Sequence, residues 1–249
     1  DHIVASTGEL QNMMEVLTKE QIDRFKKSRS ASSPMIIISQ DEAIINEKSR
    51  SKKVKTWRYK AKNVRDFAFT SSRKFIWDAM GVKLGDRTVM AMSYYPKEAN
   101  PLYERYSTRA VAHTLNVYSK YTFDYPYPVA ISVEAANGME YPMICFNYGR
   151  PQKDGTYSER IKYGMISVII HEVGHNYFPM IVNSDERQWT WMDEGLNSYL
   201  QFLAEQEWDR DYPSRRGPAK NIVNYMKSDK KNLMPCLLYT SDAADDDVR

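Results

Sequence analysis

The sequence predicts an α+β fold, and the order of its apolar segments is the main reason. Residues 88–96 (TVMAMSYYP) and 129–135 (VAISVEA) are short apolar runs of strand length. Residues 103–122 carry apolar side chains at helical spacing, and residues 160–178 and 192–208 have the character of two further helices. The order strand, helix, strand, helix, helix is typical of a domain in which helices and sheet share one core.

Composition narrows the class of protein. Hydrophobic residues make up 42% of the 249 residues, as in a folded globular protein. The 35 basic and 32 acidic residues leave a formal charge of +3, too close to balance to indicate a nucleic-acid or membrane partner. No apolar run approaches the roughly 18 residues that span a bilayer. Cys145 and Cys236 form neither a disulfide framework nor a Cys-x-x-Cys pair, so a transition metal would depend on histidine and carboxylate ligands.

Residues 1–67 are expected to end an N-terminal β domain. The segment opens with DHIVAS, contains the apolar run MIIIS at 35–39, and closes with partly alternating polar and apolar residues at 55–69. A basic stretch runs from Lys48 to Lys62. We interpret this stretch as the solvated face of a strand and hairpin in preference to a binding patch.

Residues 68–235 are expected to form a second domain that holds the three helices. Pro179 ends the helix of residues 160–178. Asp193 and Glu194 fall in the first turn of the helix that starts at residue 192. The second domain therefore carries every motif discussed below.

Residues 236–249 (CLLYTSDAADDDVR) differ in composition from the rest of the chain. They resemble the translation of a transposon-derived sequencing adaptor, so we expect them to be an artefact and exclude them from the fold. The sequence starts at Asp1 without a signal peptide, and we expect it to be an internal fragment. Cytoplasmic and exported locations both fit such a fragment.

His171 and His175 are the main candidates for metal ligands. On a helix they are four residues apart, so their rings project from one face within reach of one ion. Glu172 projects to the side of the pair, where it could hold a water molecule without binding the metal. The run MISVII before His171 indicates a buried helix, and a buried histidine pair without a metal would need two other partners.

A catalytic zinc ion needs a third protein ligand. The acidic residues that follow the histidines are Asp185, Glu186, Asp193 and Glu194. If the helix from residue 192 packs antiparallel to the first, a carboxylate in its early turns can face the two rings. Asp193 and Glu194 both meet this condition, and spacing alone does not separate them.

Three motifs resemble the aminopeptidase N family of gluzincin zinc aminopeptidases. His-Glu-x-x-His is followed by eighteen residues and then Glu194, which is that family's ligand spacing. WTWMDEGLNSYL at 189–200 is similar to the family's Trp-x-x-Glu-Gly segment. NGMEYPMICF at 137–146 is similar to its Gly-x-Met-Glu-Asn substrate motif. The resemblance covers nearly all of residues 1–235 and implies that 68–235 is the first part of a thermolysin-like zinc metallopeptidase domain.

The resemblance implies a role for each matching residue. His171, His175 and Glu194 would bind one zinc ion, and Glu172 would be the general base for a zinc-bound water. The substrate-binding residues would be Gly138, Met139 and Glu140: glycine permits close approach of the substrate backbone, and Glu140 would pair with the free α-ammonium of a peptide. The implied function is a zinc metalloaminopeptidase that acts on peptides with a free N-terminus.

The sequence also departs from the family pattern. Tyr141 replaces an asparagine after Glu140, Pro179 and Met180 stand where many members have Gly-Asn, and Asp193 replaces a common asparagine. The family's oxyanion-stabilising tyrosine usually lies well beyond the third ligand. Tyr199, Tyr212 and Tyr225 are too close to Glu194, and Tyr239 lies in the adaptor-like tail, so we expect the fragment itself to be weakly active or inactive.

Two other functions fit the same residues. One is a thermolysin-type zinc endopeptidase, with the same metal chemistry and no amine-binding role for Glu140. The other is a catalytically dead relative that acts as a binding scaffold. The retention of Glu172 beside both histidines argues against the scaffold, since a scaffold does not need a general base.

Overall fold

The computed structural model describes residues 1–136, 138–218, 220, 223 and 227–229. Asn137, Tyr225, Tyr239 and the adaptor-like segment 236–249 lie outside the described residues. Helices and strands are mixed along the chain, as the α+β prediction requires. Within the described residues, no helix is both long enough and apolar enough to cross a bilayer.

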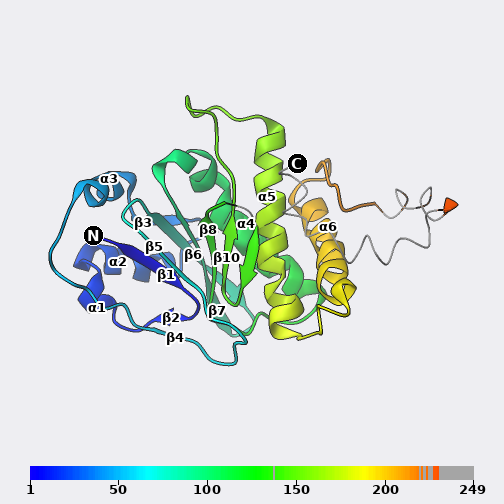
Figure 1. Cartoon of the computed structure of the whole chain (residues 1–249), viewed down its shortest axis with the longest axis horizontal. Helices are drawn as coiled ribbons and strands as arrows, with labels where there is room; N and C mark the ends of the chain where they lie inside the picture. Colours follow the sequence, from blue (N-terminus) through cyan, green and yellow to red (C-terminus); the bar gives the residue numbers. More distant parts are fainter. Residues whose placement is uncertain (137, 219, 221–222, 224–226, 230–249) are drawn as a thin grey trace.

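A six-stranded sheet forms the centre of the molecule (Figure 1). Its middle strands are parallel, whereas the strands at both edges run antiparallel to their neighbours. In spatial order the strands are β3 (Met35–Ile38), β6 (Ile76–Leu84), β7 (Arg87–Tyr95), β8 (Val129–Glu134), β10 (Ile144–Asn147) and β9 (Met139–Tyr141). The strands predicted at 88–96 and 129–135 are therefore confirmed as β7 and β8, which are buried at the centre of the sheet.

Residues 1–67 are not all β, and this expectation was wrong. They contain three helices: α1 (Met13–Val16), α2 (Lys19–Ser28) and α3 (Gln40–Lys48). Both α2 and α3 start at a capping box, Thr18 with Gln21 and Ser39 with Glu42, in which each side chain bonds to the other residue's backbone N–H. These local signals mark both helix starts, whereas the alternating pattern behind the β expectation lies further along the chain, at 55–69.

The remaining strands of this region form two small sheets. β1 (Ile3–Ser6) pairs with β5 (Phe69–Ser72), and β2 (Glu9–Leu10) pairs with β4 (Tyr59–Lys60). Strand β3, by contrast, belongs to the central sheet through its pairing with β6. The domain boundary near residue 67 stays a prediction, with two strands of the first region, β1 and β3, paired to strands that follow residue 67.

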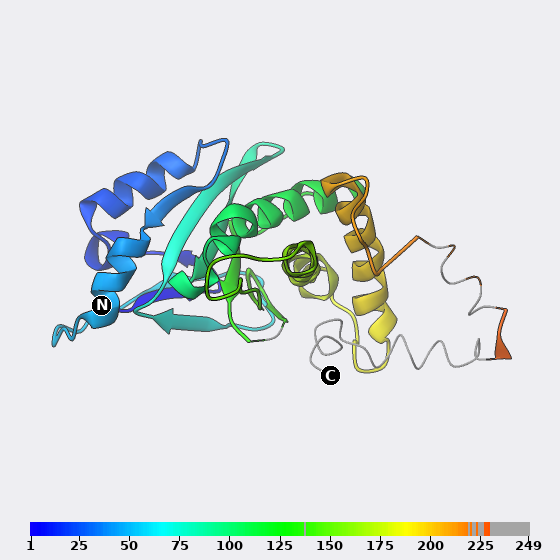
Figure 2. The ribbon, with the colours of Figure 1, turned by 90° about the horizontal axis from the view of Figure 1, so that it is seen from above.

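The helices of residues 68–229 cover the sheet and gather at one end of the molecule. α4 packs on β6, β7 and β8, and α5 packs on β10. α5 and α6 lie side by side, far from α2 and α3 (Figures 1 and 2). The bounds are η1 (Lys97–Ala99), α4 (Leu102–Tyr121), α5 (Glu159–Gly174), η2 (Asn176–Ile181), η3 (Trp191–Gly195) and α6 (Leu196–Trp208).

The three predicted helices are present, with two differences at their ends. α5 passes into the π-helical turn η2, and the backbone leaves helical geometry at Phe178, directly before Pro179. The ring of a proline disfavours helical geometry in the preceding residue, which explains this break. The helix expected from residue 192 begins as the wider π-helical turn η3 before α6. Asp193 and Glu194 lie in this turn.

Gly174 is the position where α5 approaches its neighbours most closely. A Cβ atom there would lie 2.2 Å from Asn197 Oδ1 on α6 and 2.4 Å from the Tyr118 hydroxyl on α4. Asn197 is held in place by hydrogen bonds: the Tyr118 hydroxyl donates to its Oδ1 at 2.7 Å, and its Nδ2 donates to the His171 carbonyl at 2.9 Å. Only glycine lets the three helices meet at this spacing.

We expect Gly174→Ala to destabilise the fold by about 1–3 kcal/mol, because the added methyl group must displace Asn197 or Tyr118. Gly164→Ala on the same helix is the matched control. Apart from the helix's own backbone, no heavy atom of the described residues lies within 4 Å of the position that a Cβ at Gly164 would take. That control should be neutral or gain up to about 1 kcal/mol from helix propensity. Urea unfolding of both variants tests this, and equal midpoints would contradict the packing argument.

Candidate metal centre and active site

Helix α5 presents the two histidines of the predicted pair toward one point. His171 and His175 are each 1% exposed, and their Nε2 atoms are 3.0 Å apart. One helical turn separates the residues, so their rings leave the same face of α5. The ring planes are nearly perpendicular, at 86°. The predicted pair therefore converges through its Nε2 atoms.

Glu194 completes a group of three, and Asp193 takes a different position. Glu194 Oε2 lies 3.2 Å from His171 Nε2, and Glu194 Oε1 lies 3.6 Å from His175 Nε2. Asp193 Oδ1 lies 2.7 Å from Nδ1 of His175, on the other side of that ring. The geometry thus distinguishes Glu194, which faces both Nε2 atoms, from Asp193, a distinction that residue spacing alone did not make.

The separations between the three residues are close to those in a tetrahedral metal site. Zinc binds histidine nitrogen at about 2.0–2.1 Å, so adjacent ligand atoms of a tetrahedral site are about 3.3 Å apart. The two Nε2 atoms are 3.0 Å apart, Glu194 Oε2 is 3.2 Å from His171 Nε2, and Glu194 Oε1 is 3.6 Å from His175 Nε2. Two imidazoles and one carboxylate are the kind of donor set that catalytic zinc sites use, with a fourth position left for water.

The opposite nitrogen of each ring is held by the protein. His171 Nδ1 lies 2.9 Å from Gln201 Oε1, and His175 Nδ1 lies 2.9 Å from the Phe178 carbonyl. Both of these oxygens accept hydrogen bonds, so the proton of each neutral ring belongs on Nδ1 and the lone pair on Nε2. The two lone pairs then point into the group of three.

Gln201 did not emerge from the sequence. It lies seven residues after Glu194 and is 2% exposed. Two helical turns separate residues seven apart, so the spacing places Gln201 on the helix face that carries Glu194. That spacing is the signal that could have identified it.

Glu172 and Glu140 lie next to the histidines. Glu172 is 1% exposed on α5, and Glu140 is half-buried on β9. Ligand atoms of Glu140, Glu172 and His175 all lie within 4.8 Å of one another. Of the other two residues predicted to bind substrate, Gly138 is half-buried and Met139 is exposed. The structure therefore brings Glu140 to the centre and leaves Met139 at the rim.

A buried asparagine joins the Glu140 hairpin to helix α5. Asn176 directly follows His175, and its Oδ1 accepts a hydrogen bond from the Met143 backbone N–H at 2.7 Å. The same oxygen accepts from the Tyr125 hydroxyl at 3.2 Å. Met143 lies in the turn between β9 and β10 with a positive φ of 67°. Asn176 therefore sets how strand β9, and Glu140 on it, lies against α5.

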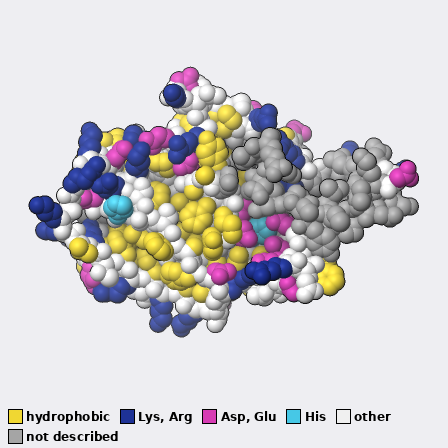
Figure 3. Space-filling model, in the orientation of Figure 1, with side chains coloured by type: hydrophobic (Ala, Val, Ile, Leu, Met, Phe, Trp, Pro, Cys, Tyr) yellow, Lys and Arg dark blue, Asp and Glu magenta, His cyan; other side chains and the backbone are white. Residues whose placement is uncertain are grey.

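The electrostatics of the centre favour a cation. Burial acts to lower the pKa of His175, but Asp193, Glu140 and Glu194 together hold that pKa well above its ordinary value. Burial raises the pKa of the Glu194 carboxyl, opposed by His175. Several carboxylates thus surround the rings, and a bound divalent cation would balance their charge. Figure 3 shows acidic side chains around a histidine at the edge of a hydrophobic face.

The structure shows what surrounds several of the residues that depart from the family pattern. The Tyr141 ring packs edge-on against Phe146 at 6.2 Å, and Met180 is buried at 8% exposure. Of the tyrosines beyond Glu194 that are described, Tyr199 is exposed and Tyr212 is buried. The Tyr212 hydroxyl donates to the Tyr163 carbonyl at 2.9 Å, so this hydroxyl is bound on the far part of α5.

Comparison with known proteins shows the fold. No protein-family model and no curated protein matches the sequence. One similar structure is the crystal structure of an M1 zinc metallopeptidase from Deinococcus radiodurans. The match covers 83% of this chain and 38% of the metallopeptidase chain, with 15% sequence identity and a TM-score of 0.51. A mutant two-domain M1 zinc metallopeptidase bound to L-arginine is also similar. That match covers 84% of this chain and 39% of the metallopeptidase chain, with 15% sequence identity and a TM-score of 0.52. The chain shares the fold of the matched part of these structures. The chain spans under two fifths of the length of these structures.

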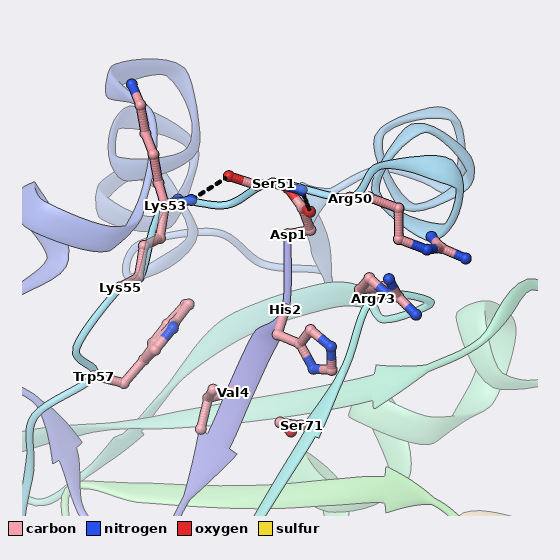
Figure 4. A pocket seen from close by; sticks show the side chains of 10 residues that line it. All are labelled: Asp1, His2, Val4, Arg50, Ser51, Lys53, Lys55, Trp57, Ser71 and Arg73. Carbon is pink, nitrogen blue, oxygen red and sulfur yellow. Dashed lines mark hydrogen bonds between the residues drawn. The ribbon is translucent and has the colours of Figure 1, made fainter.

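Two cavities lie away from the metal centre, in the first region. One of about 420 Å³ has Arg50 and Arg73 on one side and Lys55 with Trp57 on the other (Figure 4). A neighbouring groove of about 770 Å³ is lined by aromatic residues that include Phe67 and Phe69. The basic cavity falls on the stretch Lys48 to Lys62. The Lys55 ammonium donates to the Val16 carbonyl at 2.8 Å, and the interpretation of this stretch as a solvated face stays a prediction.

The geometry predicts different effects for the two neighbouring carboxylates. Glu194→Ala should abolish tight zinc binding, because it removes one of three ligands. Asp193→Asn should weaken binding by about 10–100-fold, since it alters only a partner of a ligand. Equilibrium dialysis with zinc measures both affinities, and His113→Ala, which changes a histidine outside the cluster, is the control. A larger loss for Asp193→Asn than for Glu194→Ala would contradict this assignment.

Proposed function

We propose that the chain belongs to a zinc metalloaminopeptidase, an enzyme that hydrolyses the N-terminal residue from peptides. The observation that carries the proposal is the position of Glu140 beside Glu172 and His175, within 4.8 Å at their ligand atoms. A carboxylate this close to the reaction centre suits a substrate whose cation is equally close to the scissile bond. A free α-ammonium group is such a cation, and only the N-terminus of a peptide supplies it there.

His171, His175 and Glu194 would hold the zinc ion. When bound, zinc supplies Lewis acidity, which lowers the pKa of a water molecule and polarises a carbonyl group. The matched fold and the short distances from the Glu194 carboxylate to both Nε2 atoms support this role. Gln201 and the Phe178 carbonyl orient the two rings for it.

Glu172 would act as the general base. Its carboxylate accepts a proton from the water that attacks the scissile carbonyl, and returns this proton to the nitrogen of the departing amine. The water oxygen forms the new C–O bond first, and the C–N bond then breaks as the carbonyl group re-forms and the amine nitrogen takes up the proton. Because Glu172 is buried on α5 between the two histidines, it is held close to the reacting atoms.

The α-ammonium of the substrate would bind Glu140, and Gly138 and Met139 would lie along its backbone. β9 is the edge strand of the central sheet, bonded only to β10 within the described structure. Its other edge can therefore align an extended peptide. The L-arginine bound by one matched metallopeptidase is an amino acid with a free α-amine, the kind of product that such a reaction releases.

Replacing the general base tests the mechanism directly. In the protein that carries this chain, Glu172→Gln should lower kcat by about 10²–10⁴-fold while zinc stays bound, because Glu172 is not a ligand. Zinc content of the purified variant, measured by atomic absorption, separates loss of the base from loss of the metal. Hydrolysis at an undiminished rate would rule out the role given to Glu172.

The choice of exopeptidase over endopeptidase rests on the free amine. We expect a peptide with a free N-terminus to be hydrolysed and its N-acetylated form to resist hydrolysis. Glu140→Ala should raise KM for the free peptide by about 10–100-fold through loss of the charged contact. If the acetylated peptide is cleaved equally well, the thermolysin-type endopeptidase is the correct function. If both peptides resist cleavage while zinc is bound, the scaffold is the better description.

A further inference from the structure

The segment between the two halves of the metal centre is held by few contacts. His171 and His175 lie on α5, Glu194 lies on η3, and residues 182–190 join them. None of these nine residues is buried, and Trp189 is 49% exposed. Apolar burial therefore does little to fix this segment, so its polar contacts act together with the packing of α6 in setting where η3 begins.

One side chain from the first region binds this segment. Arg65 Nη1 donates to Glu186 Oε2 and Arg65 Nη2 donates to Glu186 Oε1, both at 3.0 Å. In the described part of the chain, no other hydrogen bond or ion pair connects residues 182–190 with a residue before 175 or after 195. A bidentate pair of this kind fixes direction as well as distance.

Both ends of the ion pair are tied to fixed structure. On the Arg65 side, the Tyr127 hydroxyl donates to the Asn63 carbonyl at 2.9 Å, and Tyr127 is 6% exposed beside β8. On the Glu186 side, the Thr190 hydroxyl donates to the Glu186 carbonyl at 2.8 Å. Thr190 directly precedes η3. A continuous series of contacts thus runs from the core through Arg65 to the turn that carries Glu194.

We infer that Arg65 is a positioning residue for the metal centre: its ion pair with Glu186 places η3 so that Glu194 meets both histidines. The inference rests on the proposed function. It also assigns a role to Glu186, one of the four carboxylates considered for the third ligand. The carboxylate of Glu186 is occupied by Arg65 and holds the segment, while Glu194 faces the rings.

The chain contains a closely matched control pair. Arg24 and Glu42 also form a bidentate ion pair, with distances of 3.0 and 2.7 Å, at the junction of α2 and α3. The side chains are 32% and 30% exposed, compared with 29% and 34% for Arg65 and Glu186. Exposed pairs contribute little to global stability. Removing either pair should therefore change stability similarly, and only removal of the Arg65 pair should change the metal centre.

The test measures metal binding by the whole chain. Arg65→Gln should weaken zinc binding by roughly tenfold in competition with a chromogenic chelator, as changes behind metal ligands do. It should also alter the visible absorption of the Co²⁺-substituted protein, which reports ligand geometry. Arg24→Gln should change neither. The double variant Arg65→Glu with Glu186→Arg, which reverses the pair, should recover most of the affinity.

The outcomes separate this inference from the proposed function. If the wild type binds zinc and Arg65→Gln binds it with the same affinity and Co²⁺ spectrum, the positioning role is wrong and the zinc site stands. If Arg24→Gln weakens zinc binding equally, the effect of Arg65→Gln is a general loss of stability, and the positioning role of Arg65 is again wrong. If the wild type binds no zinc, the proposed function and this inference fall together.

Discussion

The close approach of α6 to α5 at Gly174 is the contact on which the candidate site depends. Without a side chain at that position, Asn197 of α6 reaches the His171 carbonyl and the Tyr118 hydroxyl at once. This amide thereby links α4, α5 and α6. Because η3 leads directly into α6, the same contact carries Glu194 across to the two imidazoles. Helix packing at this one small residue therefore helps to bring the donor set together.

Charge at the centre follows from burial. His171, His175 and Glu172 are almost completely buried, and Asp193 and Glu194 lie close to the rings. Charges in such a setting interact more strongly than in water, and a bound cation would balance the excess of carboxylates. The ring nitrogens that face away from the centre are bound by Gln201 and the Phe178 carbonyl. A divalent cation would satisfy the charge and the geometry together.

The first region of the chain takes part in the site through two kinds of contact. Thr7 donates to the Pro142 carbonyl at 2.9 Å, in the turn of the hairpin that carries Glu140. Arg65 binds Glu186 in the segment before Glu194. The hairpin and the segment thus each have a support from the first region. A domain boundary near residue 67 would separate residues whose side chains act on one centre.

Features that depend on neighbouring residues could be predicted from the sequence, whereas the placement of side chains from distant segments could not. The histidine pair followed from the 3.6-residue period of a helix, and β7, β8, α4 and the start of α5 followed from apolar spacing. The capping boxes of α2 and α3 were equally local signals, and the β expectation for residues 1–67 did not take them into account. Residue spacing did not decide whether Asp193 or Glu194 is the third ligand. Adjacent residues on a helix differ by about 100° in direction, and only the packing of α6 and the π-helical turn η3 decides which of the two faces the rings. The roles of Gln201, Asn176 and Arg65 depend on side chains brought together from distant segments, which local propensity does not encode.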